Sequence, residues 1–288
     1  KDRFMCRSNI KDDYFEYNEL FKNFESKKIE SVINSLRQPF ADIAKNLDIT
    51  TNTQWIVRTY LASKMILASS VMLTSAEYAE SKNLRIVNPY LMYYPLLSCA
   101  RAVVFTNPYQ EWSDDLIAMN HSKTINIIGD IVSRYDKAEG EHIKSLINKS
   151  RIYREIYSYK FPANGLKEIE LNFDKIVDIC ALLSEIAQLQ SAILESAITK
   201  HCTEKYEIDD EELSKLYSYG EEGFRFIDPE DGYRLGYIKR KVSRPYSIIN
   251  TMTEGMVEDF FGAWCSLEEN PEDVYNPDEN WRIIFPVP

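Results

Sequence analysis

The residues best suited to hold a phosphate group are two arginines that lie three positions apart, Arg151 and Arg154. Residues at this spacing share one face of a helix, and Lys144 and Lys160 would lie on neighbouring turns. Guanidinium and ammonium groups arranged in this way bind phosphate oxygens, which indicates a strip for RNA or another phosphate-bearing ligand. The strip also fits a second interpretation, in which these cations form a solvated face or pair with the acidic C-terminal part of the chain.

A second basic cluster lies within that acidic part. It combines cations with tyrosines, which suits single-stranded nucleic acid because bases stack on aromatic rings. Four positive charges are few, so pairing with nearby acidic residues is the competing interpretation. The members are Lys239, Arg240, Lys241 and Arg244, flanked by Tyr233, Tyr237 and Tyr246.

The residue types that bind metals or cofactors are not grouped in the sequence. The five cysteines are scattered, and no set of cysteines and histidines has the spacing of zinc ligands. Consecutive acids such as Asp114 and Asp115 cannot share one helix face, and they suit helix starts better than metal binding. The glycine-rich phosphate loop, HExxH and Gly-x-Ser-x-Gly motifs are all missing. We therefore predict no cofactor, no metal site, and reduced thiols in a cytoplasmic protein.

Charge is distributed unevenly along the chain. Residues 206–288 contain 8 basic and 19 acidic residues, whereas residues 1–205 contain 26 of each. A neutral main body argues against a general nucleic-acid binder, whose affinity depends on many phosphate contacts. The acidic part suits solubility, the covering of a basic surface, or contact with a basic partner.

Length and composition predict a mostly helical protein with a substantial core. The 288 residues are 44% hydrophobic and include only 9 glycines. No uninterrupted apolar run reaches the roughly 18 residues that span a bilayer, and residues 1–10 lack the apolar segment of a secretory signal. We therefore expect no association with membranes.

Proline, asparagine and serine positions predict where helices begin and end. Pro39 is expected to end the first helix, and Asn88 followed by Pro89 to start the third. Pro95 is expected to kink the third helix or delay its regular start. Ser113 is expected to start the fourth helix. Apolar periodicity predicts helices over 13–37, 54–81, 88–105, 113–131, 139–159 and 167–202.

The pattern changes after residue 205. Short helices are expected near 209–219 and 246–265, with a small hairpin turning at Asp228–Gly232 between them. The stretch from Glu268 to Pro288 is expected to be an extended tail on the surface. We divide the chain into an N-terminal helical segment 1–50, a helical bundle 51–205 and an acidic C-terminal extension 206–288.

Several short motifs in residues 88–202 follow one another in a recognisable order. The motifs are Tyr93-Tyr94, Ala100-Arg101-Ala102, His121-Ser122, Ile127-Ile128-Gly129, Arg151 to Tyr159, Asn164-Gly165 and the long helix 167–202. They resemble the HEPN superfamily, helical bundles found in toxin–antitoxin systems, phage-defence proteins and nucleotidyltransferase partners. The resemblance covers 115 of the 288 residues and implies an all-α fold.

Ribonucleases of this family carry an arginine, then four to six residues, then a histidine, and the pair usually works across a dimer. Histidine can move the proton of the 2′-hydroxyl, and arginine can stabilise the phosphorane. Arg154 stands at the arginine position, but no histidine follows it. Tyr159 falls in the window, and the ordinary tyrosine pKa of about 10 makes it a weak base at neutral pH. His121, at a helix start, either takes part in the chemistry or has a capping or packing role.

The resemblance thus implies a HEPN-like protein without the full motif, which binds RNA, a nucleotide or a protein partner. It implies a defence or toxin–antitoxin setting and a homodimer formed through the helix of Arg151 and Arg154. One alternative is an active, metal-independent endoribonuclease that uses Arg154 with Tyr159 or His121. Another is a helical protein–protein interaction module without RNA affinity.

Overall fold

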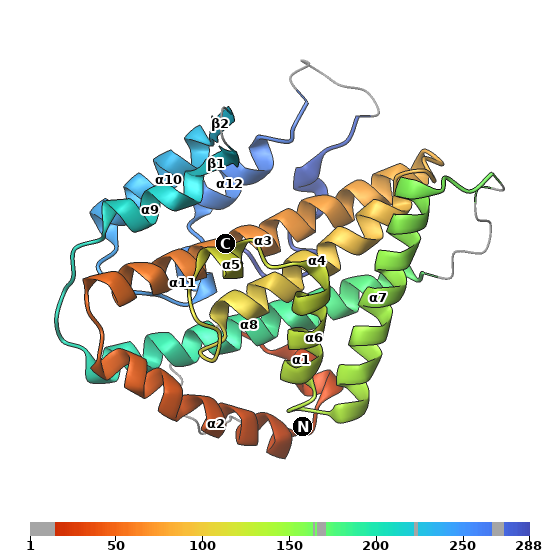
Figure 1. Ribbon diagram of the computed structural model, residues 1–288. Coiled ribbons are helices and arrows are strands. Elements are labelled where there is room, and N and C mark those ends of the chain that lie inside the picture. The colour runs from red at the N-terminus through yellow and green to blue at the C-terminus, as the bar shows by residue number, and fades with distance from the viewer. Residues whose placement is uncertain (1–14, 164, 166–170, 222–223, 267–273) are drawn as a thin grey trace.

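Helices make up most of the computed structural model, which describes residues 15–163, 165, 171–221, 224–266 and 274–288 (Figure 1). The predicted helical class is therefore confirmed. The first eight helices are α1 (Asn18–Asn23), α2 (Ser26–Lys45), α3 (Ile49–Ser81), α4 (Asn88–Thr106), α5 (Asp114–Ile117), α6 (His121–Val132), α7 (Lys137–Tyr159) and α8 (Phe173–His201). The C-terminal part contains α9 (Asp210–Tyr217), β1 (Ser218–Glu221), β2 (Phe224–Ile227), α10 (Pro229–Lys241), α11 (Ile248–Thr251), α12 (Glu254–Gly262) and the 3-10 helix η1 (Pro277–Asn280).

Helix α4 lies at the centre of the bundle. It packs against α3 and α8 and also against the pair α6 and α7, which explains why its sequence is apolar on most sides. Helix α8 is buried along most of its length, and Gln190 is one of several polar residues among its buried positions. The Gln190 Oε1 accepts a hydrogen bond from Thr106 Oγ1 at 3.0 Å, so this amide oxygen has a partner inside the core.

Helices α3 and α8 are long and apolar enough to cross a membrane by length and composition alone. However, 78% and 83% of their most apolar windows are buried inside the bundle. Burial of this kind is typical of the core helices of a soluble protein, and the protein core accounts for their hydropathy.

The N-terminal region differs from the prediction of one helix ending at Pro39. The chain forms two helices, with a break at Phe24 and Glu25, and Pro39 lies inside α2. Pro39 has no N–H to donate to the carbonyl of Ser35 one turn earlier. The hydroxyl of Tyr109 donates to that carbonyl instead, at 3.2 Å, so the freed acceptor has a partner and the helix can continue.

Helix α4 also begins differently from the prediction. Asn88 is its first residue rather than its cap, and the buried Asn88 Oδ1 has no hydrogen-bond partner among the described residues. The helix continues through Pro95, whose carbonyl accepts a hydrogen bond from Ser69 Oγ of α3 at 3.1 Å.

The predicted helix 113–131 is divided into two. Ser113 caps α5 as expected, but α5 ends after one turn at Ile117. Asn120 then caps α6 by accepting a hydrogen bond from the Lys123 N–H at 2.9 Å. This break makes His121 the first residue of α6, which agrees with the helix start that the motif order placed at His121.

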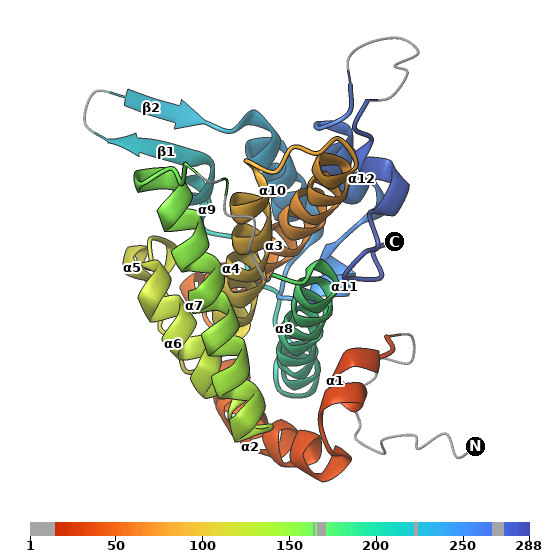
Figure 2. The same cartoon turned by 90° about the vertical axis from the view of Figure 1, so that its right-hand side faces the viewer.

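The C-terminal part contains the expected hairpin at a different position. Strands β1 and β2 pair antiparallel, with Ser218 opposite Ile227, and the hairpin projects from the upper left edge of the molecule in Figure 2. The turn predicted at Asp228–Gly232 is wrong. The Asp228 side chain caps α10 by accepting hydrogen bonds from the N–H groups of Glu230 and Asp231.

One hydrophobic core joins the N-terminal, central and C-terminal segments. Helices α9, α11 and α12 pack on α3. The expected surface tail is in part buried, because Ile284, Phe285 and Val287 belong to this core. The Phe285 ring lies 5.2 Å from the ring of Phe15, so the two ends of the described chain meet there.

Candidate anion-binding site

Three helices bring arginines from distant parts of the sequence around one histidine. His121 opens α6, Arg101 lies near the end of α4, and Arg151 and Arg154 lie in the C-terminal half of α7. Helices α6 and α7 pack side by side and both contact α4 (Figure 2). We refer to Arg101, His121, Arg151 and Arg154 together as the arginine cluster.

Arg154 lies at the centre of the arginine cluster. Its Nη2 is 3.4 Å from His121 Nδ1. Its guanidinium carbon lies 5.4 Å and 5.9 Å from the ring centres of Tyr93 and Tyr94, within the range of cation–π attraction. The side chain is only 11% exposed, so these contacts hold it in one orientation.

Arg151 and Arg101 lie on either side of this centre. Arg151 forms the outer edge, where its Nη1 donates to the hydroxyl of the exposed Ser122 at 2.6 Å and its side chain is 25% exposed. Arg101 forms the inner side, where its Nη2 donates to the carbonyl of Met119 at 3.0 Å. Burial lowers the pKa of Arg101, an effect that the neighbouring Tyr93 opposes. An approaching anion therefore meets Arg151 first.

The arginine cluster carries more positive charge and more hydrogen-bond donors than its protein partners use. Glu155 is the one carboxylate paired with Arg151 or Arg154 in the described part of the chain, and its Oε1 is 3.8 Å from each. Three guanidinium groups against one carboxylate leave two positive charges in excess. Four buried polar atoms have no hydrogen-bond partner there: the Nε atoms of Arg101, Arg151 and Arg154 and the Tyr93 hydroxyl oxygen. Buried polar atoms are rarely left unpaired, so an anion with several oxygens would suit this site.

His121 is held in its neutral form at this site. Burial lowers the pKa of His121, and the positive charges of Arg154, Arg101 and Arg151 lower it further, while Glu155 opposes them. Arginine can only donate hydrogen bonds, so we assign Nδ1 as the acceptor from Arg154 and place the proton on Nε2. In this tautomer His121 offers an N–H to an anion and has no free lone pair with which to take a proton.

Tyr93 also keeps its proton. Burial raises the pKa of Tyr93 to about 12, although Arg154 and Arg151 favour its ionised form. The neutral hydroxyl can therefore donate a hydrogen bond to an oxygen of a ligand.

The remaining cations of the predicted strip lie apart from this site. The side chain of Lys144 packs over Gly129 of α6, where a Cβ atom would lie 3.1 Å from Lys144 Cδ. Lys160 is the exposed residue that follows α7. Tyr159 is 79% exposed and has no hydrogen bond or ring contact with Arg154 in the described part of the chain.

The second predicted cluster, on and after α10, is divided among several surroundings. Lys239 pairs with Asp210, which matches the interpretation that acids of the same region neutralise it. Arg240 is exposed and Arg244 is half-buried. Lys241 lines a cavity of 210 Å³ between α3 and the helices α10 to α12, together with Tyr60, Tyr237, Tyr246 and Met256.

The structure adds residues to which the sequence assigned no role. Arg101, Tyr93, Tyr94 and Ser122 belong to the short motifs described above, and that membership was the available signal. Helix packing then places all four around His121 and the arginines of α7. Within its described ranges the structure holds no group of three or more potential metal ligands.

The fold and this site define the chain as a mainly helical protein with a candidate anion-binding arginine cluster. Comparison with known proteins adds no narrower assignment, because no family model, no curated protein and no solved structure matches it.

Proposed function

We propose that this chain is a HEPN-like protein that binds the phosphate groups of RNA or of a nucleotide at the arginine cluster and does not cut RNA. The observation that carries the proposal is the excess of charge and unpaired donors around His121. The arginine cluster also supports the HEPN-like assignment, because four of the motifs that suggested this family contribute residues to it.

The protonation state of His121 favours binding over cleavage. A base that removes the 2′-hydroxyl proton needs a free lone pair on a ring nitrogen. The Nδ1 lone pair of His121 faces Arg154, and Nε2 carries the proton in the assigned tautomer. A donor of this kind stabilises bound phosphate, as do the neighbouring guanidinium groups.

The proposal includes a cytoplasmic homodimer formed through α7, in a defence or toxin–antitoxin setting. Helix α7 exposes Ile152 and Tyr159, which lie seven residues apart and share one helix face, with the half-buried Ile156 between them. An exposed apolar stripe of this kind suits contact with a second copy. Sedimentation of wild type and Ile152→Glu tests it, since the charge should shift a dimer to monomer.

Fluorescence anisotropy with end-labelled single-stranded RNA and with a labelled nucleotide tests the binding function. Arg151→Gln should weaken binding about tenfold, because the outermost guanidinium is lost. Lys137→Gln removes the same charge from an exposed position at the other end of α7 and should leave affinity unchanged. Circular dichroism matches the variants for folding.

The outcomes of this titration distinguish the proposed site and function from the alternatives. Binding that weakens with salt and depends on Arg151 supports the proposal. Equal affinity of wild type and Arg151→Gln contradicts the site. No binding of RNA or nucleotide by wild type contradicts the function and leaves the helical interaction module as the better interpretation.

A metal-independent endoribonuclease is the second candidate, and one contact favours it. His121 lies 3.4 Å from Arg154, so it could take the place of the histidine that is missing after Arg154 in the sequence. Incubation with total RNA in the presence of a chelator tests this candidate. Cleavage that disappears in His121→Asn, while RNA binding remains, would establish it. An intact RNA pool at high protein concentration would rule it out.

A further inference from the structure

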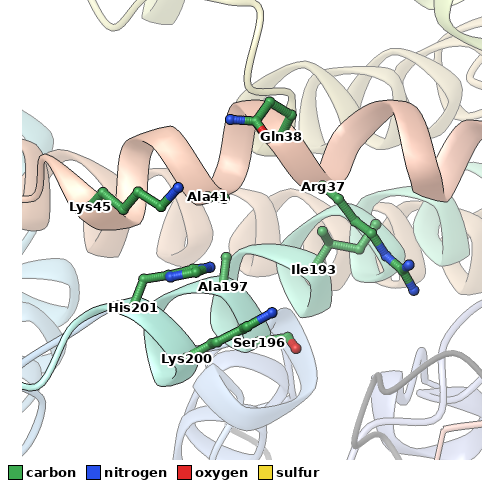
Figure 3. Close-up of a pocket in the computed structure, with 9 residues that line it drawn as sticks. All are labelled: Arg37, Gln38, Ala41, Lys45, Ile193, Ser196, Ala197, Lys200 and His201. Atoms are coloured by element: carbon green, nitrogen blue, oxygen red, sulfur yellow. The ribbon is translucent and has the colours of Figure 1, made fainter.

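A separate groove lies between the C-terminal halves of α2 and α8, far along the chain from the arginine cluster (Figure 3). Its volume is 520 Å³, within the range of about 300–1,000 Å³ that small-molecule sites occupy. Small side chains at the helix crossing leave this space open, and its floor is apolar. The floor residues are Ala41, Ile193 and Ala197.

The walls of the groove are basic. Arg37 and Lys45 come from α2, and Lys200 and His201 come from the end of α8. Figure 3 shows Lys45, Lys200 and His201 around one end of the groove and Arg37 toward the other. Among the described residues no acidic residue lines the groove, and all four basic side chains are exposed there without an ion pair.

The helix ends explain only part of this arrangement. Lys45 lies in the last turn of α2, and Lys200 and His201 lie in the last turn of α8, where cations stabilise the negative end of the helix dipole. Each helix end contributes roughly half a negative charge, so two ends offset about one positive charge. Arg37 lies two turns before the end of α2 and is not explained in this way. Of the three lysine and arginine charges in the groove, about two therefore remain available to a ligand.

We propose that this groove is a second ligand site, which binds a nucleoside phosphate. Lys45, Lys200 and His201 hold the phosphate at one end. The base lies on the apolar floor, where the planar guanidinium of Arg37 stacks on it. The ligand is either a free nucleotide or the phosphorylated end of an RNA strand, since both present the same chemistry.

The three histidines of the chain allow this site to be observed by itself. His201 lies in the groove, His121 lies in the arginine cluster, and His142 contacts Glu139 near the start of α7. Two-dimensional NMR of the imidazole carbons resolves three signals, which single His→Gln variants assign. Titration with ATP and AMP should shift the His201 signal, with the His142 signal as the internal reference.

Matched variants test whether the basic wall is responsible. Lys45→Gln combined with Lys200→Gln should raise the dissociation constant measured from His201 at least about tenfold. Lys27→Gln combined with Lys28→Gln removes the same charge from exposed positions on α2 outside the groove and should leave that constant unchanged. Adenosine and inorganic phosphate, each carrying half of the ligand, should bind at least about tenfold more weakly than AMP.

The outcomes separate the proposal from its alternatives. An unmoved His201 signal at millimolar ATP and at millimolar end-phosphorylated RNA overturns it, as does equal weakening by the control pair. A shift produced by inorganic phosphate as readily as by AMP also overturns it, since the base would then contribute nothing. A shift at lower concentrations of end-phosphorylated RNA than of AMP supports the site and identifies a strand end as its ligand.

Discussion

Two mostly buried arginines in this molecule, Arg58 and Arg154, both pack against aromatic rings but differ in their hydrogen-bond partners. The guanidinium of Arg58 lies 3.9 Å from the ring centre of Trp55, and all its nitrogen groups are satisfied in the described structure. Arg154 has a ring nitrogen of His121 at 3.4 Å and a carboxylate at 3.8 Å, and its Nε has no partner there. The acceptors of Arg58 are the carbonyl oxygens of Phe105, Asn107 and Gln110, at 2.6, 2.7 and 2.8 Å.

The difference separates a structural arginine from a candidate binding arginine. Arg58 supplies donors to carbonyls at and beyond the end of α4, where the helix itself supplies none. Burial lowers the pKa of Arg58 to about 9, and its three charge-assisted hydrogen bonds oppose that cost. Arg154 instead keeps unused hydrogen-bonding capacity in a cluster with excess positive charge, which a bound anion would use.

The largest effect on stability is expected from Arg58→Met. Three carbonyls would lose their donor, and the free energy of unfolding should fall by about 3 kcal/mol. Urea denaturation followed by circular dichroism measures it, with the exposed Arg85→Met as control. A loss below about 1 kcal/mol would contradict the structural role assigned to Arg58.

Glu185 is a buried group of the opposite charge. Glu185 is only 7% exposed and accepts hydrogen bonds from the N–H groups of Glu19 and Leu20 in α1, at 3.0 and 2.7 Å. Burial raises the pKa of Glu185 to about 7, although these bonds oppose the shift. The folded state therefore binds the proton more tightly than the unfolded state, whose glutamate has a pKa of 4.5.

The sign of the pH dependence follows from that difference. The stabilisation is fully present below about pH 4.5 and is lost as the pH rises through about 7, by about 3 kcal/mol. Glu185→Gln should remove this component, so the stability difference between the two proteins should change between about pH 5 and pH 8. Urea denaturation across that range measures it, and a wild type that gains stability over Glu185→Gln with rising pH would reverse the predicted sign.

The two arginines of α7 should separate stability from binding. Arg154→Ala should lower the free energy of unfolding by about 1 kcal/mol, because the contacts with Tyr93 and Tyr94 are lost. Arg151→Ala should leave stability unchanged within about 0.5 kcal/mol. Both should weaken RNA or nucleotide binding about tenfold in anisotropy. Undiminished binding by Arg154→Ala would make Arg154 a structural residue like Arg58.

The smallest effect is expected from Lys239→Gln on α10. Its ion pair with Asp210 joins two exposed side chains, and such pairs contribute about 0.5 kcal/mol or less. Neither stability nor RNA affinity should change measurably. Weaker RNA binding by this variant would instead assign the basic segment of α10 to the nucleic-acid interface.

Local pattern was sufficient to predict the type of most long elements. Apolar periodicity predicted the helices seen as α3, α4, α7 and α8, and the spacing of Arg151 and Arg154 placed them on one helix face. The order of short motifs was sufficient to indicate His121 as a candidate site residue. Helix periodicity and capping depend on residues within about one turn, so the sequence alone carries this information.

The tertiary structure decided whatever depends on partners from elsewhere in the chain. Pro39 stays inside α2, where the hydroxyl of Tyr109 donates to the Ser35 carbonyl that Pro39 leaves free, 74 positions earlier in the chain. His121 contacts Arg154, which lies 33 positions away. Asp228, which was predicted in a turn, caps α10, and part of the predicted surface tail is buried in the core. Contacts across such separations form only when packing of the whole chain offsets the entropy of closing the loops between them, and no local pattern encodes that balance.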